Sequence, residues 1–507
     1  AKGAVNYLKF GMKKLIFTLL AGVAAAFGAA AASYDFAQDG VYYKVLSAED
    51  ATVAVVAGSS DYQGSVAIPA QVADEGGAQY TVVAIGEDAF SECTKLTSVE
   101  LPETLQSIEG YAFYDTGLSD ITIPASVTKI APYAFRYSSS LKTMTFNADP
   151  VCLEPEAFED CLALTTLSGP YASEDGRCLL ADEGKTLKLF APGGIESYTL
   201  PESVETVAPY VFYYMYEMDD YELVGPKEIN MPNVTTIGER AFSLCQTLER
   251  VTMPKVETID KFAFYSCYWD DGYNYSGLKG IDLPKVKTIG AMAFNMCCGM
   301  ETIVLGADLT EVGEGAFDIL KSLTSITMWC QDPQGISIAE DEFYSSNAKY
   351  ATLSVPYGSA YYYETIKPWS NFENIEPFTL VESVSLNAER VELEVGETFQ
   401  LEVAVEGSAF TAPEWTSRRE QYVTVDADGR LTAVAEGVAT VYVSVDGVTA
   451  ECVVTVAGES GIDSVAVDTN AAVRYYNLNG TPVDAANLQP GIYVKRQGNK
   501  TSKVIVK

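Results

Sequence analysis

Apolar and polar positions along most of the chain follow a repeating pattern built around the dipeptide Ala-Phe. Successive phenylalanines of this pair stand 22 or 23 residues apart, except where a longer piece intervenes. A period of about 20 to 50 residues is typical of a solenoid, in which each repeat buries its apolar face only against its neighbours. The pattern therefore predicts a long repetitive surface, which favours binding over catalysis. The pair occurs at Ala89-Phe90, Ala112-Phe113, Ala134-Phe135, Ala157-Phe158, Ala241-Phe242, Ala263-Phe264, Ala293-Phe294 and Ala316-Phe317.

One repeat shows the unit that we expect to form a single coil of the solenoid. It contains Ile121-Thr-Ile123-Pro124, a short alternating segment that proline closes, followed by the pair Ala134-Phe135. Such alternation with a terminal proline indicates a short strand. Stacked coil on coil, these strands should form one parallel sheet, with the phenylalanine buried on the opposite arm. Equivalent segments stand at Val99–Pro102, Tyr198–Pro201, Ile229–Pro232, Val251–Pro254 and Ile281–Pro284.

A cysteine follows the phenylalanine by three residues in five of the repeats. A residue type that recurs at one repeat position is typical of an internal ladder, so we expect buried, reduced thiols that pack as small apolar side chains. Disulfides remain an alternative in an exported protein, because consecutive repeats bring Cys245 and Cys267 near each other. No CxxC pair supports a metal site, and we expect neither a metal nor another cofactor. The five are Cys93, Cys161, Cys245, Cys267 and Cys297.

Composition and charge narrow the classes of function. The formal net charge of the 507 residues is −36, which repels nucleic-acid phosphates, so we expect no nucleic-acid partner. The chain contains no histidine, which removes Ser-His-Asp and Cys-His catalysis and every histidine-containing metal site. A glycosidase that uses two carboxylates is a remote alternative, because paired acids need a set separation in a cleft. We therefore expect no enzyme activity.

The repeat unit resembles the BspA-like leucine-rich repeats of bacterial surface proteins, whose units follow the approximate pattern I-x-I-P…V-x-x-I-x-x-x-A-F-x-x-C-x-x-L. The resemblance covers about residues 81–330. It implies a mainly β chain with short helical turns, in which an N-terminal lead-in or cap over 33–80 precedes a leucine-rich-repeat solenoid over 81–378. The stretch from Leu353 to Ile375 is similar to the closing unit of that family. The resemblance also implies an adhesin-like role at the cell surface.

Residues 1–32 carry the pattern of a targeting segment. The apolar stretch Leu15–Phe27 follows a pair of lysines and is succeeded by small residues up to Ala32, which is typical of a secretory signal peptide. The stretch is too short to span a membrane. We expect residues 1–11, which precede Met12, to be an upstream extension. The mature protein should be exported to the cell surface or the extracellular space, with no membrane span.

The spacing between equivalent residues of successive repeats lengthens in three places. From Phe158 to Phe212 it is 54 residues, and the extra piece carries turn residues between two apolar runs, which predicts an inserted hairpin. From Phe212 to Pro232, and again from Phe264 to Pro284, the distance is 20 residues instead of the ordinary 11 or 12. Both of these longer segments leave the solenoid at the same point of the repeat, so they should emerge on the same face.

The two longer repeats are rich in tyrosine and acidic residues. Insertions on one side of a solenoid are often its binding surface. Tyrosine and tryptophan offer large, rigid contact area, and adjacent carboxylates can engage lysine or arginine. Alternatively, the loops pack on each other and shield the core from water. The candidate ligand-binding residues are Tyr213, Tyr214, Tyr216, Asp219, Asp220, Tyr221, Tyr268, Trp269, Asp270, Asp271, Tyr273 and Tyr275.

After Pro377 the repeat stops and short alternating segments begin. The segment from Trp415 through Gly429 to Gly437 resembles bacterial Ig-like group 2 domains. That resemblance implies a β-sandwich over 381–457, which serves such proteins as a stalk or as an adhesive module.

The last segment, 461–507, differs from the rest of the chain in charge. Its motifs Asn477–Gly480 and Pro490–Val494 and its lysine-rich end resemble the C-terminal sorting domains of the Bacteroidetes type IX secretion pathway, which implies passage across the outer membrane. An ordinary small β-module kept on the mature protein is the alternative. The basic residues are Arg474, Lys495, Arg496, Lys500, Lys503 and Lys507.

These patterns together predict an exported surface protein that binds its partner noncovalently and catalyses no reaction. We expect it to recognise a host or extracellular protein through the repeat face and its tyrosine-rich loops, and to meet the export machinery through its signal peptide and tail. A carbohydrate-binding surface protein is the main alternative.

Overall fold

The chain is built mainly of strands and tight turns. The computed structural model describes residues 34–58, 61–215, 217–219, 222–270, 272, 274–458, 472–498 and 500–507, and of 217–219 and 222–224 it describes the backbone alone. The expected signal peptide lies outside the described residues. Two units, Ala1–Phe378 and Thr379–Lys507, divide the chain. No helix in the part that the structure describes is long and apolar enough to cross a membrane.

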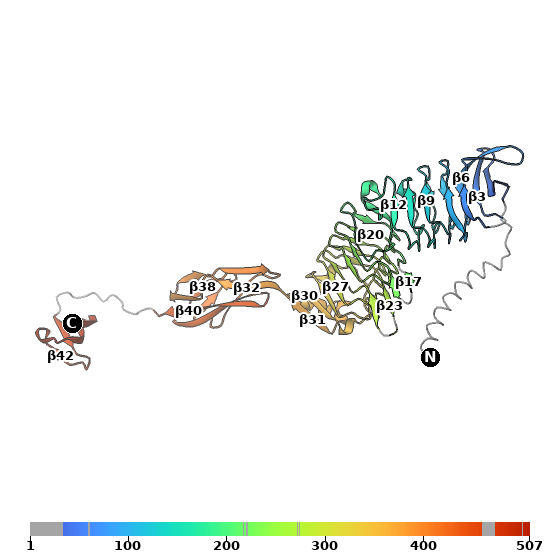
Figure 1. Ribbon diagram of the computed structural model, residues 1–507. Coiled ribbons are helices and arrows are strands. Elements are labelled where there is room, and N and C mark those ends of the chain that lie inside the picture. The colour runs from blue at the N-terminus through green and yellow to red at the C-terminus, as the bar shows by residue number, and fades with distance from the viewer. Residues whose placement is uncertain are drawn as a thin grey trace. The chain divides into compact units, whose positions relative to one another are not determined.

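Each repeat winds once around the solenoid and has three sides. In one such coil β9 (Asp120–Ile123) forms the first side and β10 (Lys129–Ile130) forms the second. The third side contains no strand, and consists of tight turns that carry Ala134-Phe135. We call this third side the turn arm. Figure 1 shows the coils following one another through the unit from β6 to β31.

The strands of the first side run parallel, as the sequence predicted, but they do not form one sheet. The hydrogen-bonded ladder is interrupted three times. Between β12 and β15 the reason is an inserted hairpin, which separates the two strands along the solenoid. The four groups are β4 (Gly64–Ala67) with β7 (Leu96–Glu100); β9 with β11 (Thr143–Phe146) and β12 (Thr166–Ser168); β15 (Ser197–Thr199) with β19 (Glu228–Asn230) and β21 (Arg250–Thr252); and β25 (Gly280–Leu283) with β27 (Thr302–Leu305), β29 (Ser325–Met328), β30 (Thr352–Pro356) and β31 (Asn374–Phe378).

The second side carries a column of strands, and half of them are two-residue strands that the sequence did not reveal. Each two-residue strand consists of one half-exposed or exposed residue and one buried residue, most often Thr-Ile. Two residues are too few to produce a recognisable alternation. The first sheet comprises β1 (Phe36–Gln38), β2 (Val41–Ser47), β3 (Thr52–Val56), β5 (Gln71–Ala73), β6 (Gln79–Ile85), β8 (Ser107–Ile108) and β10; the second comprises β13 (Cys178–Ala181), β14 (Thr186–Phe190), β16 (Thr206–Val207), β20 (Thr236–Ile237), β22 (Thr258–Ile259), β26 (Thr288–Ile289) and β28 (Glu311–Val312).

The hairpin predicted between Phe158 and Phe212 is confirmed. Strands β13 and β14 pair antiparallel across the short 3₁₀ turn Asp182–Gly184. Strand β14 then pairs parallel with β16, so the hairpin begins the second sheet of the second side. The insertion is therefore part of the solenoid wall.

The core of the solenoid is a column of stacked phenylalanines, as the Ala-Phe spacing predicted. Phe113 lies 4.9 Å from Phe135 between ring centroids, with the rings 11° from parallel, and Phe242 lies 4.9 Å from Phe264. Seven of the eight phenylalanines of the Ala-Phe pairs are fully buried. The exception is Phe158, which is only half-buried. It stacks on Phe135 on one side alone, and the core divides at this coil into two clusters of buried residues.

The C-terminal end of the solenoid is closed by side chains. Helix α2 (Ala360–Thr365) and the 3₁₀ turn Trp369–Asn371 lie between β30 and β31. Tyr363 and Trp369 are fully buried there, and the Tyr363 hydroxyl donates to the carbonyl of Cys330. Apolar ends that would meet water are covered in this way. Three further 3₁₀ turns in this unit are Pro150–Cys152, Pro333–Gly335 and Ala348–Tyr350.

Residues 380–457 form an Ig-like β-sandwich. Its centre is made by buried apolar side chains, among them Val441, Cys452 and Val454. Strand β33 pairs parallel with β40, whereas β36, β39 and β40 pair antiparallel. The strands are β32 (Leu380–Leu386) with β35 (Val403–Ser408); β33 (Arg390–Glu394), β40 (Val448–Ala457), β39 (Gly437–Val445) and β36 (Glu414–Ser417); and β34 (Thr398–Gln400), β38 (Arg430–Ala433) and β37 (Val423–Val425).

The end of the chain forms a small antiparallel sheet. Its strand order is β42 (Pro482–Val483), β41 (Val473–Tyr476), β43 (Gly491–Gln497) and β44 (Lys500–Val506). A 3₁₀ turn at Ala485–Asn487 precedes β43. Most of its side chains are exposed or half-exposed.

Candidate binding face on the turn arm

The turn arms of neighbouring coils are joined by a ladder of backbone hydrogen bonds. The amide of Phe135 donates to the carbonyl of Ala157 at 2.8 Å, and those of Tyr133 and Tyr137 donate to Glu156 and Glu159 at 3.1 Å. The same bond joins Phe to the next Ala along both halves of the solenoid. Within an unbroken run of coils, each Ala-Phe pair is therefore both an acceptor and a donor in this ladder.

Two residues in every turn arm adopt left-handed backbone conformations. They are the residue before alanine, such as Tyr133 with a φ of 62°, and the second residue after phenylalanine, such as Tyr137 with a φ of 59°. This conformation costs non-glycine residues on the order of 1 kcal/mol. In most coils the amides at these positions donate to the next coil, so the ladder offsets the strain there. The side chains at these positions flank the buried pair and are partly exposed.

Aromatic side chains recur at these two positions and at the residue directly after phenylalanine, which is also partly exposed in Tyr114 and Tyr213. Tyr111 and Tyr133 lie 5.3 Å apart between ring centroids, and the guanidinium of Arg136 lies 4.6 Å from the centroid of Tyr137. Further along, Tyr210 and Tyr213 lie 5.3 Å apart. We call this set the aromatic stripe: Tyr111, Tyr114, Tyr133, Tyr137, Tyr210, Tyr213, Tyr214, Phe262 and Tyr265.

The cysteines of the repeat are buried and free, and the structure assigns them a specific contact. In four coils the thiol donates to the carbonyl of the phenylalanine in the preceding coil. Serine takes over the same contact where it replaces cysteine, since the Ser138 hydroxyl donates to Phe113 at 2.8 Å. Burial raises the pKa of the Cys245 thiol to about 12, so these thiols are scaffold. The contacts are Cys161 to Phe135 (3.1 Å), Cys245 to Phe212 (2.7 Å), Cys267 to Phe242 (2.9 Å) and Cys297 to Phe264 (3.1 Å).

The two tyrosine-rich segments leave the turn arm as short hairpins. β17 (Glu217–Asp219) pairs with β18 (Glu222–Val224), and β23 (Tyr268–Asp270) pairs with β24 (Tyr275–Gly277), both antiparallel. Figure 1 shows β17 and β23 on the same edge of the solenoid. Their point of departure matches the one that the sequence predicted.

The structure places the described candidate residues in different surroundings. Tyr213 and Tyr214 belong to the aromatic stripe. Tyr268 is half-buried and its ring lies 5.9 Å from that of Tyr275, which is 38% exposed. Asp270 accepts a bond from the amide of Gly272 at 2.8 Å and so closes its own turn. Trp269 is half-buried. Of the other candidates, Asp219 is described by its backbone alone, and Tyr216, Asp220, Tyr221, Asp271 and Tyr273 lie outside the described residues.

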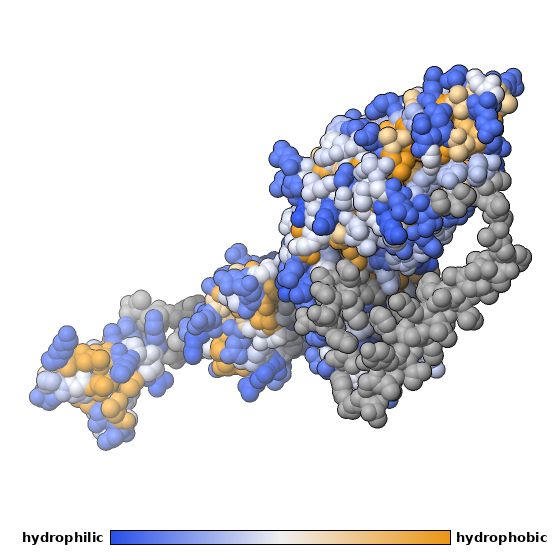
Figure 2. Space-filling view, turned by 45° about the vertical axis from the view of Figure 1, so that its right-hand side comes forward, coloured by the Kyte–Doolittle hydropathy of each residue, from blue (hydrophilic) through white to orange (hydrophobic). Residues whose placement is uncertain are grey.

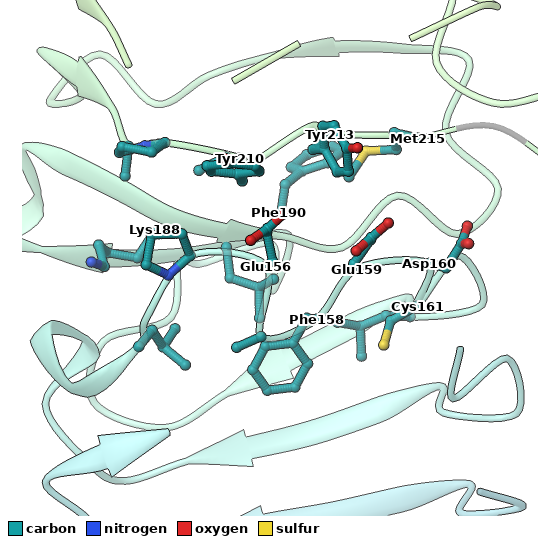
Figure 3. A pocket seen from close by; sticks show the side chains of 18 of the residues that line it. Glu156, Phe158, Glu159, Asp160, Cys161, Lys188, Phe190, Tyr210, Tyr213 and Met215 are labelled. Carbon is teal, nitrogen blue, oxygen red and sulfur yellow. The ribbon is translucent and has the colours of Figure 1, made fainter. Parts of the chain in front are cut away.

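A cleft opens in the turn arm where the phenylalanine stack is interrupted. It has a volume of about 60 Å³ and lies between the coil of Phe158 and the coil of Phe212. Figure 3 shows Tyr210, Tyr213 and Met215 along one wall, and carboxylates below them. The acidic lining residues are Glu154, Glu156, Glu159 and Asp160, and the basic one is Lys188.

The most buried carboxylate of the cleft is that of Glu159. One of its oxygens lies 3.1 Å from Nη2 of Arg136, and the side chain is 6% exposed. Burial raises the pKa of Glu159 from 4.5 to about 7, against the attraction of Arg136 and with a smaller contribution from Glu156. Burial, with Glu159 as the next contribution, also raises the pKa of Tyr213 to about 12.

The acidic residues of this cleft are not among the candidate residues that the sequence predicted. The 54-residue gap between Phe158 and Phe212 could have pointed to these residues, because it shows that one coil has a hairpin in place of its turn arm. A missing turn arm leaves the flanking arms apart. Glu156 and Glu159 occupy repeat positions that are aromatic in neighbouring coils, for example Tyr133 and Tyr114, and this substitution of acidic for aromatic residues was the second signal.

The side of the solenoid that is visible in Figure 2 is chemically mixed. In Figure 2 apolar side chains on the visible side of the solenoid form small groups among hydrophilic ones. Among the described residues there is no group of three or more cysteine, aspartate and glutamate side chains that could hold a metal ion. The arrangement offers aromatic surface and carboxylates, which is the chemistry of noncovalent recognition.

Several solved structures are similar to this chain. They include the pneumococcal vaccine antigen PcpA, at 19% identity and a TM-score of 0.42, over 68% of this chain and 99% of that one. A leucine rich cell surface protein from Faecalibacterium prausnitzii A2-165 is similar at 20% identity and a TM-score of 0.32, over 58% of this chain and 94% of that one. A leucine-rich repeat protein from Bacteroides ovatus ATCC 8483 is similar at 20% identity and a TM-score of 0.27, over the same shares.

Family models confirm two of the resemblances drawn from the sequence. No curated protein matches the chain. The model of the bacterial Ig-like domain (group 2) matches residues 380–456. The model of the BspA type leucine rich repeat region matches in six copies, over residues 78–174, 221–273 and 269–385. Because these repeat matches cover more than half of its length, the chain belongs to the BspA type leucine rich repeat family.

Proposed function

We propose that this protein is an exported, adhesin-like surface protein that binds a host or extracellular protein through the turn arm of its solenoid. The observation that carries the proposal is the aromatic stripe, which continues from Tyr111 to Tyr265 and adjoins both hairpins. Tyrosine gives contact area at a low cost in conformational entropy and is enriched at the centre of protein interfaces. Other coils carry Asp88, Arg240 or Met292 at the repeat position of Tyr133, so the coil forms without an aromatic residue there.

Each domain has a separate role in this proposal. The lead-in over 33–80 and the solenoid over 81–378 bind the partner without catalysis. The Ig-like domain over 381–457 holds the solenoid away from the surface. The module over 461–507 directs passage across the outer membrane, as its likeness to type IX sorting tails implies, and the signal peptide directs the first step of export. The family match and the bacterial Ig-like match favour a surface location.

The proposal is tested by binding to arrays. The full chain without residues 1–32 is applied to an array of extracellular matrix proteins and to an array of glycans. A second protein has short Gly-Ser links in place of 216–223 and 269–275, and a control lacks only 461–507. We expect signals on the protein array that fall at least tenfold without the hairpins and persist without the tail. Signal on the glycan array alone would establish the carbohydrate alternative, and signal on neither array would refute a binding role.

A further inference from the structure

We infer that the cleft between Phe158 and Tyr213 binds a basic side chain, lysine or arginine, of the partner polypeptide. This inference deepens the proposed function and rests on it, since it names the residue that the turn arm would recognise. The cleft lies within the aromatic stripe, between Tyr137 and Tyr210 in repeat order, so a partner lying on the stripe would cross it. Three features of the cleft carry the inference: unpaired backbone groups, carboxylates beside aromatic rings, and size.

The backbone ladder of the turn arm is open on both sides of the cleft. In other coils the amide of phenylalanine donates to the next coil, and in most of them the amide before alanine does so as well. At this step the amides of Glu156 and Phe158 have no hydrogen-bond partner in the described chain, and the carbonyl of Val211, which stands in the place of alanine, accepts none. Buried or half-buried backbone groups need partners, which water or a ligand must supply.

The side chains of the cleft favour a cation, because four carboxylates line it against one lysine, Lys188. Glu156, Glu159 and Asp160 lie on one wall, while Tyr210 and Tyr213 lie on the other (Figure 3). An ammonium or guanidinium between a carboxylate and an aromatic face gains from both, by about 0.5–2 kcal/mol for the ring alone. Arg136 engages only one oxygen of Glu159, and no hydrogen bond to the other oxygen is present among the described residues.

The size of the cleft decides between a side chain and a sugar. One water needs roughly 10–15 Å³, so a space of about 60 Å³ holds a few waters. A guanidinium or ammonium fits such a space, whereas a hexose is several times larger. The stem of the bound residue would then extend over the rim toward Met215.

The unpaired amides favour a cationic side chain of a polypeptide over a polyamine as the ligand. Glu156 and Phe158 present N–H donors, and a basic residue in a peptide brings its own backbone carbonyl to accept from them. A polyamine has donors only and would leave both amides unpaired. The carbonyl of Val211 remains as an acceptor for the cationic head.

The test follows the methyl resonance of Met215, which lines the cleft, in protein labelled at its methionine methyl groups. The probes are N-acetylarginine methylamide, its neutral citrulline analogue, and butylguanidine, which lacks the carbonyls. We expect the arginine derivative to bind at least tenfold more tightly than the citrulline derivative and more tightly than butylguanidine. Glu156→Gln should weaken it about tenfold. Asp88→Asn is the matched control, because Asp88 holds the same repeat position and a φ of 55° in a coil without a cleft.

The outcomes separate this inference from the proposed function. Equal binding of the arginine and citrulline derivatives, or equal loss in Glu156→Gln and Asp88→Asn, would overturn the inference. A protein found on the array that binds the Glu156→Gln variant as well as the natural chain would also overturn it, while the proposed function would stand. If the arginine derivative binds in the cleft but no protein on the array gives a signal, the result would support the cation site and refute the protein partner. Thermal melts of each variant show that it is folded.

Discussion

The amide of Phe135 donates to the carbonyl of Ala157 at 2.8 Å, so the Ala-Phe pair joins neighbouring coils through its backbone while its ring fills the core. One pair thus provides the acceptor for the coil before it and the donor for the coil after it. Where the following turn arm is missing, as after Phe158, both the ladder and the ring stack end and a cleft appears.

The position of a phenylalanine in this stack should determine its contribution to stability. Phe264 is fully buried and stacks on Phe242 and Phe294 at 4.9 and 5.1 Å, so Phe264→Ala is expected to lower the free energy of unfolding by about 3–5 kcal/mol. Phe158→Ala should cost clearly less, because Phe158 is half-buried and has a ring partner on one side only. Chemical denaturation of the two variants measures the difference. Equal losses would contradict the view that the stack ends at Phe158.

The cysteine ladder should tolerate serine better than alanine. The Cys245 thiol donates to the buried carbonyl of Phe212 at 2.7 Å. Cys245→Ala removes this donor and should lower the free energy of unfolding by about 1–3 kcal/mol. Cys245→Ser keeps a donor, as Ser138 does in its own coil, and should cost less. If denaturation midpoints of the serine and alanine variants coincide, the thiol contributes by packing alone.

The sequence predicted the parts of the fold that repeat with a recognisable spacing. The Ala-Phe pairs, the strands that end in proline and the hairpin at Cys178–Phe190 follow from local patterns, and the structure contains them. The column of two-residue strands did not follow, because Thr236-Ile237 and its equivalents are too short to show a period. The interruptions of the first-side sheet depend on contacts between coils, which no single repeat encodes.

The candidate site was predictable only in part. The hairpins were visible as extra residues, and Tyr213 and Tyr268 lie where that lengthening begins. The cleft required knowing that one coil lacks its turn arm, so that residues about 50 positions apart, such as Glu159 and Tyr213, come to line one space. The ion pair of Glu159 with Arg136 joins two coils and has no local signature.

Glu159 should make the stability of the solenoid depend on pH. Its pKa is raised by burial from 4.5 to about 7, so between these values the folded chain holds a proton that the unfolded chain releases. Stability is therefore fully present below about pH 4.5 and falls as the pH rises through about 7. Thermal melts across this range should show a weaker dependence for Glu159→Gln than for the natural chain. The charged and titratable groups around Glu159 include Arg136, Tyr133, Tyr137, Glu156, Asp160, Cys161 and Tyr213. If Glu159→Gln leaves the slope of melting temperature against pH unchanged, the pH dependence belongs to these neighbouring groups.

The most direct measurement compares tyrosines on the turn arm with tyrosines elsewhere on the solenoid. A double variant, Tyr133→Ser and Tyr210→Ser, removes two rings of the aromatic stripe. Its matched control is Tyr350→Ser and Tyr361→Ser, which removes rings that are 76% and 70% exposed outside the stripe. Binding of both folded variants to the protein identified on the array is measured by surface plasmon resonance. We predict a loss of at least tenfold in affinity for the stripe variant and less than twofold for the control; equal affinities would contradict a binding face on the turn arm.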